Sequence, residues 1–205
     1  MKRLFRLVIG FVIFFQIFAA TAQEISPDVL IKNITNEVLD IVRHDTDIRS
    51  GNTRKAIELI ELKMAPHANF TRMTSLAVGK DWRQTTADQR KILVDEFRTL
   101  LVRTYAKSLT EYRNQTPYFK PFKMHPTETE VIVRTEVRQS GSKPIQLDYE
   151  LEKQEDGEWK VFDIYVAGIS LVTNYRNSFS QEISAGGIAG LIASLRTKNT
   201  QVAKK

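Results

Sequence analysis

The spacing of apolar residues changes twice along this chain, and that change restricts the fold more than any other feature. From Ser26 to about Tyr112, apolar residues recur every three or four positions, which is typical of amphipathic helices. From Tyr118 to Val166 they mostly alternate with polar residues, as in half-buried strands. Helical spacing returns from Val172 onward. Helices, then consecutive strands, then helices again predict an α+β fold.

Residues that start and stop helices divide the helical parts. Ser26 and Pro27 suit the N-cap and first position of a helix, and Thr86 with Gln89 fits a capping box. Pro66 and Gly79 end two short helices. The pattern predicts about six helices, over residues 27–49, 57–64, 70–77, 89–112, 172–183 and 188–195.

The alternating part predicts a four-stranded, twisted antiparallel sheet. Pro121 makes the first strand an edge or irregular strand, because proline cannot donate a ladder hydrogen bond. Glycine-containing turns separate the strands, which we expect over residues 118–124, 131–138, 145–152 and 159–166. Helices packed on one face of such a sheet enclose either an ordinary filled core or an apolar cavity with room for a ligand.

The N-terminus has the pattern of a secretory signal peptide. A basic start at Lys2 and Arg3 precedes an apolar run over residues 7–18 and the small residues Ala20 and Ala22. The run is too short for a comfortable membrane span, although an uncleaved anchor is the alternative. We therefore predict that an exported chain remains after cleavage and divide the sequence into a signal peptide, one folded domain and a polar basic tail, over residues 1–22, 23–198 and 199–205.

Composition excludes several classes of function. The chain has no cysteine, so disulfides and thiol chemistry are absent. A cysteine-free exported protein of this size favours a bacterial periplasmic location over animal secretion. The formal charge of +6 falls by three when Lys2, Arg3 and Arg6 leave with the signal peptide. With acidic and basic residues interleaved, the rest of the chain does not resemble a nucleic-acid-binding protein.

We find no constellation typical of catalysis, a metal or a cofactor. Ser170 follows a glycine two positions earlier but lacks the second glycine of a nucleophile elbow, so we interpret it as a helix cap. Three carboxylates share one face of a predicted strand, where a solvated face is the simplest interpretation: Asp148, Glu150 and Glu152. The histidines are too far apart for a helical metal site: His44, His67 and His125.

Several blocks of sequence, in order, resemble one family. They are MTSLAVGKDW from Met73, DQR from Asp88, LVRTYAKSLTEY from Leu101, WKVFDIYVAGISLVTNYRNSF from Trp159 and GIAGLIASL from Gly187. Together they are similar to MlaC, the phospholipid-binding component of the Mla (maintenance of lipid asymmetry) system, also known as the toluene-tolerance family. The resemblance extends from about residue 26 to residue 199. One position departs from it, because Ala167 stands where many members carry a carboxylate.

The resemblance implies a monomeric periplasmic carrier that is not an enzyme and has no cofactor. Such a carrier shields the acyl chains of a phospholipid in an apolar cavity, leaving the headgroup outside. It moves phospholipid between the two membranes of a Gram-negative envelope and so maintains outer-membrane lipid asymmetry. The implied partners are an outer-membrane lipoprotein–porin complex and an inner-membrane ABC transporter with a lipid-binding ring protein.

The expected lipid contacts follow from this resemblance together with the apolar stripes. Trp82 is expected to be a structural anchor, and sequence does not rank Arg83, Arg103 and Arg176 as phosphate contacts. The candidate lipid-binding residues are Phe70, Met73, Phe97, Leu101, Tyr105, Val133, Leu147, Tyr149, Leu151, Ile164, Val166, Leu171, Tyr175 and Phe179.

Two other functions are compatible with the same pattern. A small-molecule enzyme on a cone-shaped α+β fold would use Asp163 or Tyr149 as an acid–base group inside an apolar pocket. A ligand-free envelope adaptor or chaperone would have a solid core and an exposed apolar patch. Whether an open cavity exists, and what ionisable groups line it, distinguishes these alternatives from a carrier.

Overall fold

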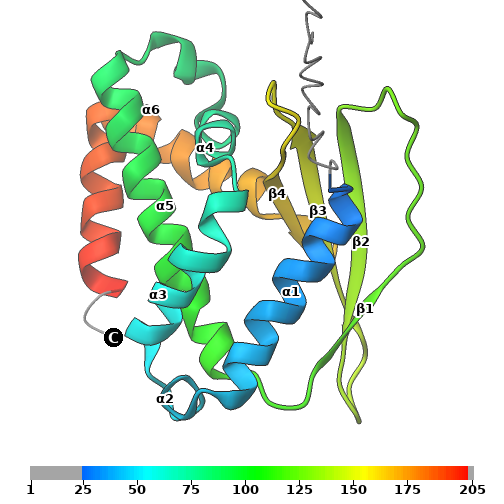
Figure 1. Ribbon diagram of the computed structural model, residues 1–205. Helices are drawn as coiled ribbons and strands as arrows, with labels where there is room; N and C mark the ends of the chain where they lie inside the picture. Colours follow the sequence, from blue (N-terminus) through cyan, green and yellow to red (C-terminus); the bar gives the residue numbers. More distant parts are fainter. Residues whose placement is uncertain (1–24, 203–205) are drawn as a thin grey trace, which may run out of the picture.

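Two layers make up the fold of residues 25–202, which the computed structural model describes. A five-stranded antiparallel sheet forms one layer and the helices form the other (Figure 1). The α+β prediction is thereby confirmed. The predicted signal peptide, residues 1–22, lies outside the described residues. Within residues 25–202, every helix is too short or too polar to cross a membrane.

The first predicted helix, over residues 27–49, is two helices. Asp45 separates them because its backbone is extended and its carboxylate accepts the amide hydrogens of Asp47 (2.9 Å) and Ile48 (3.0 Å), which caps the second helix. The helices and 3-10 turns are α1 (Pro27–His44), α2 (Thr46–Arg49), α3 (Thr53–Lys63), η1 (Ala65–His67), α4 (Phe70–Val78), η2 (Gly79–Gln84), α5 (Ala87–Thr110) and α6 (Leu171–Val202).

Two of the three predicted helix caps form. The hydroxyl of Thr86 accepts the amide hydrogen of Gln89 (3.2 Å), whose side chain accepts the amide hydrogen of Thr86 (3.0 Å), so the capping box is present. Ser170 caps α6 by accepting the amide hydrogen of Thr173 at 2.9 Å. Ser26 occupies the N-cap position of α1, but its hydroxyl bonds to a side chain and not to the backbone.

The sheet is a meander in which each strand pairs with the next. Its first strand is shorter and earlier than the predicted 118–124, because ladder pairing ends where the chain approaches Pro121. A short fifth strand pairs with the fourth across the turn Ala167–Gly168, where both residues have positive φ, as a type I′ turn requires. The strands are β1 (Thr116–Phe119), β2 (Glu130–Arg138), β3 (Ile145–Lys153), β4 (Trp159–Val166) and β5 (Ile169–Ser170).

The two predicted C-terminal helices are the two halves of α6. They meet at a kink where Gly187 has φ 65° and ψ −165°, a backbone region open essentially only to glycine. The kink brings the halves close together, since a Cβ on Gly190 would lie 3.5 Å from the carbonyl oxygen of Glu182. α6 continues to Val202, so the predicted tail at 199–205 begins in helical conformation.

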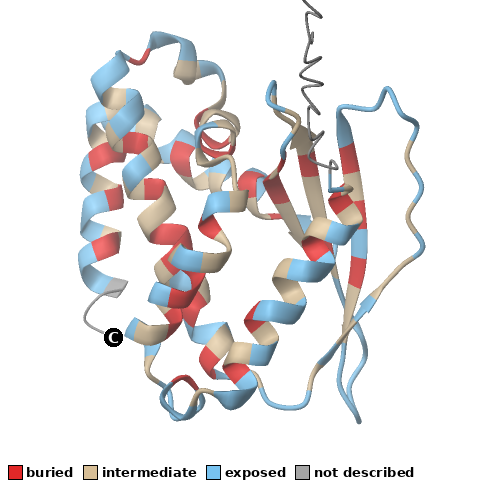
Figure 2. Ribbon diagram, in the orientation of Figure 1, coloured by how far each residue is buried: buried red, intermediate tan, exposed pale blue. Residues whose placement is uncertain are grey.

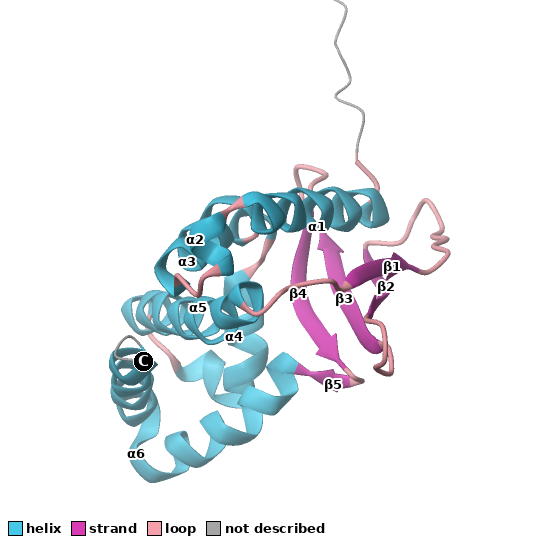
Figure 3. Cartoon of the chain, turned by 90° about the horizontal axis from the view of Figure 1, so that it is seen from below, coloured by secondary structure: helices cyan, strands magenta, loops and turns pink. Residues whose placement is uncertain are grey.

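Side chains fill the space among the helices and one end of the sheet. In the helical part, α4, α5 and α6 share a core that includes Phe97 and Phe179, and residues on their inner faces are buried (Figure 2). A second cluster packs Ile31 of α1 against Val133 and Trp159 of the sheet. Figure 3 shows α1 running alongside the sheet, with α4 and α6 on the side of β4. The space left unfilled lies between α1, α5 and the sheet.

The polar face of β3 is less solvated than predicted. Asp148 is buried, and its carboxylate accepts the amide hydrogen of Thr135 at 3.3 Å. Glu152 forms an ion pair with Arg72 of α4, and partial burial raises the pKa of Glu150. Asp148 thereby connects β3 to β2, whereas Glu152 connects β3 to α4. By alternation these carboxylates lie on the face of β3 opposite Leu147 and Tyr149.

Candidate functional site

A cavity of about 360 Å³ separates the helical layer from the sheet. This volume lies within the range of small-molecule and cofactor sites, roughly 300 to 1,000 Å³. Its helical wall consists of Ile31, Ile34, Thr35, Val38, Leu39, Ile60, Met64, Ala65, His67, Ala68, Phe70, Met73, Leu101, Val102, Tyr105, Ser108, Leu109, Tyr112 and Leu171. Its sheet wall consists of Pro117, Phe119, Thr135, Val137, Leu147, Tyr149, Val161, Ile164 and Val166.

The wall is almost entirely apolar. It includes no Asp, Glu, Lys or Arg, and its only imidazole belongs to His67. Residues 25–202 contain no group of three or more His, Asp or Glu side chains placed to hold a metal ion. The surface therefore suits hydrocarbon, which gains free energy on leaving water and needs no polar partner.

Two tyrosine hydroxyls are among the few polar groups on the wall. Burial raises the pKa of Tyr149 to about 12, and it outweighs a side-chain hydrogen bond with Thr35 that acts in the opposite direction. Burial, together with its neighbour Tyr175, raises the pKa of Tyr105 to about 12. Both phenols are neutral at neutral pH, as an ordinary tyrosine is, and the raised pKa keeps them neutral well above it, so they add no charge to the cavity.

Nine of the fourteen candidate residues line the cavity. The alternating pattern predicted the inner face of the sheet, where Leu147 and Tyr149 of β3 lie beside Val166 and Ile164 of β4. The apolar stripe of the long helix included Leu101, which also lies on the wall. The nine are Phe70, Met73, Leu101, Tyr105, Leu147, Tyr149, Ile164, Val166 and Leu171.

Five candidates lie in filled core and not on the cavity wall. Phe97 meets Tyr175 and Phe179 edge-on, with ring centroids 5.0 Å from each, so these three rings fill the space between α5 and α6. Val133 and Leu151 face the same side of the sheet as the cavity residues, but they lie at the end that α1 and Trp159 fill. Facing inward is therefore not sufficient to reach the cavity.

Sequence reasoning missed the contribution of α1, α3 and β1. Ile34 and Val38 belong to the apolar stripe of the amphipathic helix predicted over residues 27–49, but no residue of that helix was among the candidate lipid contacts. Leu39 and Thr35, beside that stripe, also reach the wall. Helical spacing identified the buried side of α1, but it contained no signal that a cavity would lie beneath it.

The acid–base candidate Asp163 is not on the wall. Its carboxylate accepts hydrogen bonds from the hydroxyl of Ser170 and from the amides of Ile164 (2.7 Å) and Val172 (3.1 Å). It therefore joins β4 to the start of α6. The unranked arginines are also elsewhere: Arg103 donates to the carbonyl of Asn199 and Arg176 to that of Leu76, each at 2.7 Å.

Comparison with known proteins gives one family. The model of the MlaC protein family matches residues 32–197. The intermembrane phospholipid transport system binding protein MlaC of Haemophilus influenzae is 24% identical over 180 residues, covering 87% of this chain and 84% of that protein. The toluene tolerance protein ttg2D of Pseudomonas putida is 23% identical over 164 residues, covering 79% and 75% respectively.

A solved structure has the same fold. It is that of a phospholipid-binding protein from Ralstonia solanacearum in complex with a phospholipid, and it superposes with a TM-score of 0.80 at 40% sequence identity. The match covers 86% of this chain and 98% of the other.

Proposed function

This chain belongs to the MlaC family, and we propose on that basis that it binds a phospholipid, with the acyl chains in the cavity between α1, α5 and the sheet. The observation that carries the proposal is the wall of that cavity, which holds no carboxylate, ammonium or guanidinium group. The lipid-bound relative from Ralstonia solanacearum supports it.

The energetics of a lipid tail require such a wall. At about 0.8 kcal/mol per buried CH₂, two acyl chains of about sixteen carbons cost on the order of 25 kcal/mol to expose to water. A carrier outside a membrane must therefore hide nearly all of both tails. A lining as apolar as a bilayer makes transfer between membrane and protein nearly balanced in free energy, so the lipid can enter and leave.

The role in the cell is part of the same proposal. The chain enters the periplasm through its N-terminal signal peptide and carries phospholipid between the membranes as a monomer. Its partners are an outer-membrane lipoprotein–porin complex and an inner-membrane ABC transporter with its lipid-binding ring protein. The name of the Haemophilus influenzae relative, an intermembrane phospholipid transport protein, supports this role.

We also propose that the protein is not an enzyme and uses no cofactor. A tyrosine is protonated at neutral pH and cannot act there as a base, and the pKa of Tyr149, raised to about 12 by burial, makes it a poorer proton donor as well. Asp163 is engaged in hydrogen bonds away from the cavity. A solid-core adaptor is disfavoured by the cavity itself.

Lipid extraction tests the proposed function. Protein purified without detergent from its native compartment is extracted with organic solvent, and the extract is analysed by mass spectrometry. We expect phospholipid in near-stoichiometric amount. Repeated absence of lipid, with no uptake from phospholipid vesicles, would overturn the proposal.

A matched pair of variants locates the lipid. Leu147 lines the cavity, whereas Ile145, two residues earlier on the same face of β3, is exposed. In Leu147→Arg the guanidinium either takes the place of the lipid tail or is buried beside it without a polar partner, and both oppose lipid binding. We therefore expect at least a roughly tenfold loss of bound lipid. Ile145→Arg is expected to retain it. Equal lipid content in both variants, with unchanged circular dichroism, would place the tails elsewhere.

A further inference from the structure

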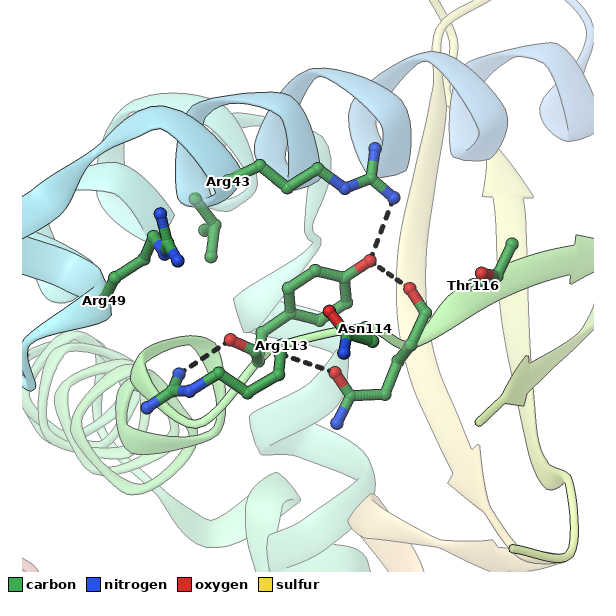
Figure 4. Close-up of a pocket in the computed structure, with 8 residues that line it drawn as sticks. Arg43, Arg49, Arg113, Asn114 and Thr116 are labelled. Carbon is green, nitrogen blue, oxygen red and sulfur yellow. Dashed lines mark hydrogen bonds between the residues drawn. The ribbon is translucent and has the colours of Figure 1, made fainter. Parts of the chain in front are cut away.

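A second hollow, of about 420 Å³, lies beside the apolar cavity and has the opposite chemistry. Three arginines border it: Arg43 from the last turn of α1, Arg49 from the end of α2 and Arg113 from the segment after α5 (Figure 4). Asn114 and Thr116 complete its polar side. Its border contains no acidic residue.

The guanidinium groups are not neutralised by neighbouring carboxylates. Within residues 25–202, none of the three arginines forms an ion pair. The acidic residues of α2 and its cap are engaged elsewhere, since Asp45 and Asp47 pair with Lys55 at 2.7 and 3.0 Å. Three arginines without a carboxylate partner therefore line one hollow, and the positive potential that they create there favours binding of an anion.

The three arginines keep donors free for a ligand. Arg43 uses one Nη to donate to the hydroxyl of Tyr112 at 3.0 Å. Arg113 uses only Nη1, which donates to the carbonyls of Thr110 and Tyr112 at 2.7 Å each. Arg49 has no hydrogen bond to any residue between 25 and 202. A planar guanidinium with free N–H groups matches the paired oxygens of a phosphate.

Tyr112 forms part of the wall of both hollows. Its half-buried ring faces the apolar cavity, and its hydroxyl bonds to Arg43 and to the carbonyl of Gln115 on the polar side. The neighbours Thr116 and Pro117 likewise line one hollow each. An apolar cavity and a cationic hollow that share a wall match the two ends of an amphiphile with an anionic headgroup.

We infer that the hollow bordered by Arg43, Arg49 and Arg113 binds a phosphate ester anion. The apolar cavity next to it makes the phosphodiester of the bound lipid the expected source, and in this respect the inference rests on the proposed function. A free phosphate compound is the other source with the same chemistry. The hollow would hold the headgroup phosphate while the tails occupy the cavity.

The test compares two lipids with identical tails. Lipid-free protein is titrated with dioleoylphosphatidylglycerol and with dioleoylglycerol, which has no phosphate, and binding is measured by displacement of a fluorescent lipid. In R43Q/R49Q/R113Q we expect the affinity for the phospholipid to fall at least about tenfold, with that for dioleoylglycerol unchanged. If the triple variant misfolds, Arg49→Gln is used instead, because it breaks no hydrogen bond or ion pair within residues 25–202, and a smaller loss of affinity for the phospholipid is expected.

A matched control separates the site from net charge. R54Q/R83Q/R134Q removes the same charge from exposed arginines that do not border the hollow, and we expect unchanged affinity for both lipids. Inorganic phosphate followed by ³¹P NMR distinguishes the sources. Phosphate binding that Arg49→Gln abolishes, with phospholipid affinity unaffected, assigns the site to a free phosphate compound.

The inference is overturned if the triple variant and Arg49→Gln bind both phospholipid and inorganic phosphate with the affinity of the unaltered protein. In that case continued binding of dioleoylglycerol leaves the proposed function intact. If the unaltered protein bound neither dioleoylphosphatidylglycerol nor dioleoylglycerol, that result would instead contradict the proposed function.

Discussion

Tyr149 illustrates at the scale of a residue how the cavity treats a polar group. Alternation along β3 predicted its inward orientation, and the structure places it on the wall. Its hydroxyl remains acceptable there because it is neutral and hydrogen-bonded to Thr35. The same burial that excludes water also opposes ionisation, which is why the pKa of the phenol rises.

Titration of the tyrosines tests this burial. All six tyrosines lie within the described residues, and in denaturant they are expected to ionise near pH 10. In the folded protein, absorbance at 295 nm after rapid pH jumps should include a component near pH 12 from Tyr149 and Tyr105. Tyr149→Phe should remove part of that component. An unchanged amplitude would show that Tyr149 is accessible to water.

The raised pKa also sets the sign of the stability change. Between about pH 10 and about 12 the unfolded chain has lost the Tyr149 proton while the folded chain retains it. The free energy of unfolding therefore falls as pH rises through this window and is unaffected by Tyr149 below it. Chemical denaturation of Tyr149→Phe across the window should give a shallower fall.

At the scale of elements, the ends of helices were predicted correctly where a single residue controls the backbone. Thr86 and Ser170 cap the helices that they were expected to cap. The predicted boundary between two C-terminal helices falls at Gly187, although α6 continues through it as a kink. By contrast, the split at Asp45 was missed, because the apolar stripe of α1 gave no sign that a cap would interrupt it.

Two adjacent glycines test the origin of the kink. Gly187→Ala forces a Cβ into a region of φ and ψ that is essentially restricted to glycine, and we expect a loss of about 1 to 3 kcal/mol in the free energy of unfolding. Gly186 has ordinary φ and free space around its Cβ position, so Gly186→Ala should be neutral or slightly stabilising. Urea unfolding midpoints measure both. Equal destabilisation would mean that the kink does not depend on Gly187.

At the scale of the whole molecule, the cavity makes stability depend on the ligand. An empty apolar wall loses the contacts that a filled interior would have. A ligand that binds only the folded state stabilises it by RT ln(1 + [L]/Kd), about 2.7 kcal/mol at one hundred times Kd.

Delipidation measures this dependence. We expect the unfolding temperature in calorimetry to fall when lipid is removed and to recover on reloading from vesicles. Leu147→Arg should unfold at the same temperature before and after delipidation, because its cavity excludes the tail. An unaltered protein with identical unfolding temperatures in both states would show that no lipid occupies the folded molecule.

The sequence by itself determined the order of elements, their periods and the inward faces of helices and strands, because these depend on neighbours three, four or two positions apart. It also excluded thiol chemistry. Only the tertiary structure decided which inward residues meet a cavity. Val133 and Leu147 face the same side of one sheet, yet one lies in filled core and the other on the wall. The physical reason is that the separation between layers depends on how α1, α5 and the sheet diverge, which no local spacing records. The meeting of Arg43, Arg49 and Arg113 around one hollow has the same origin.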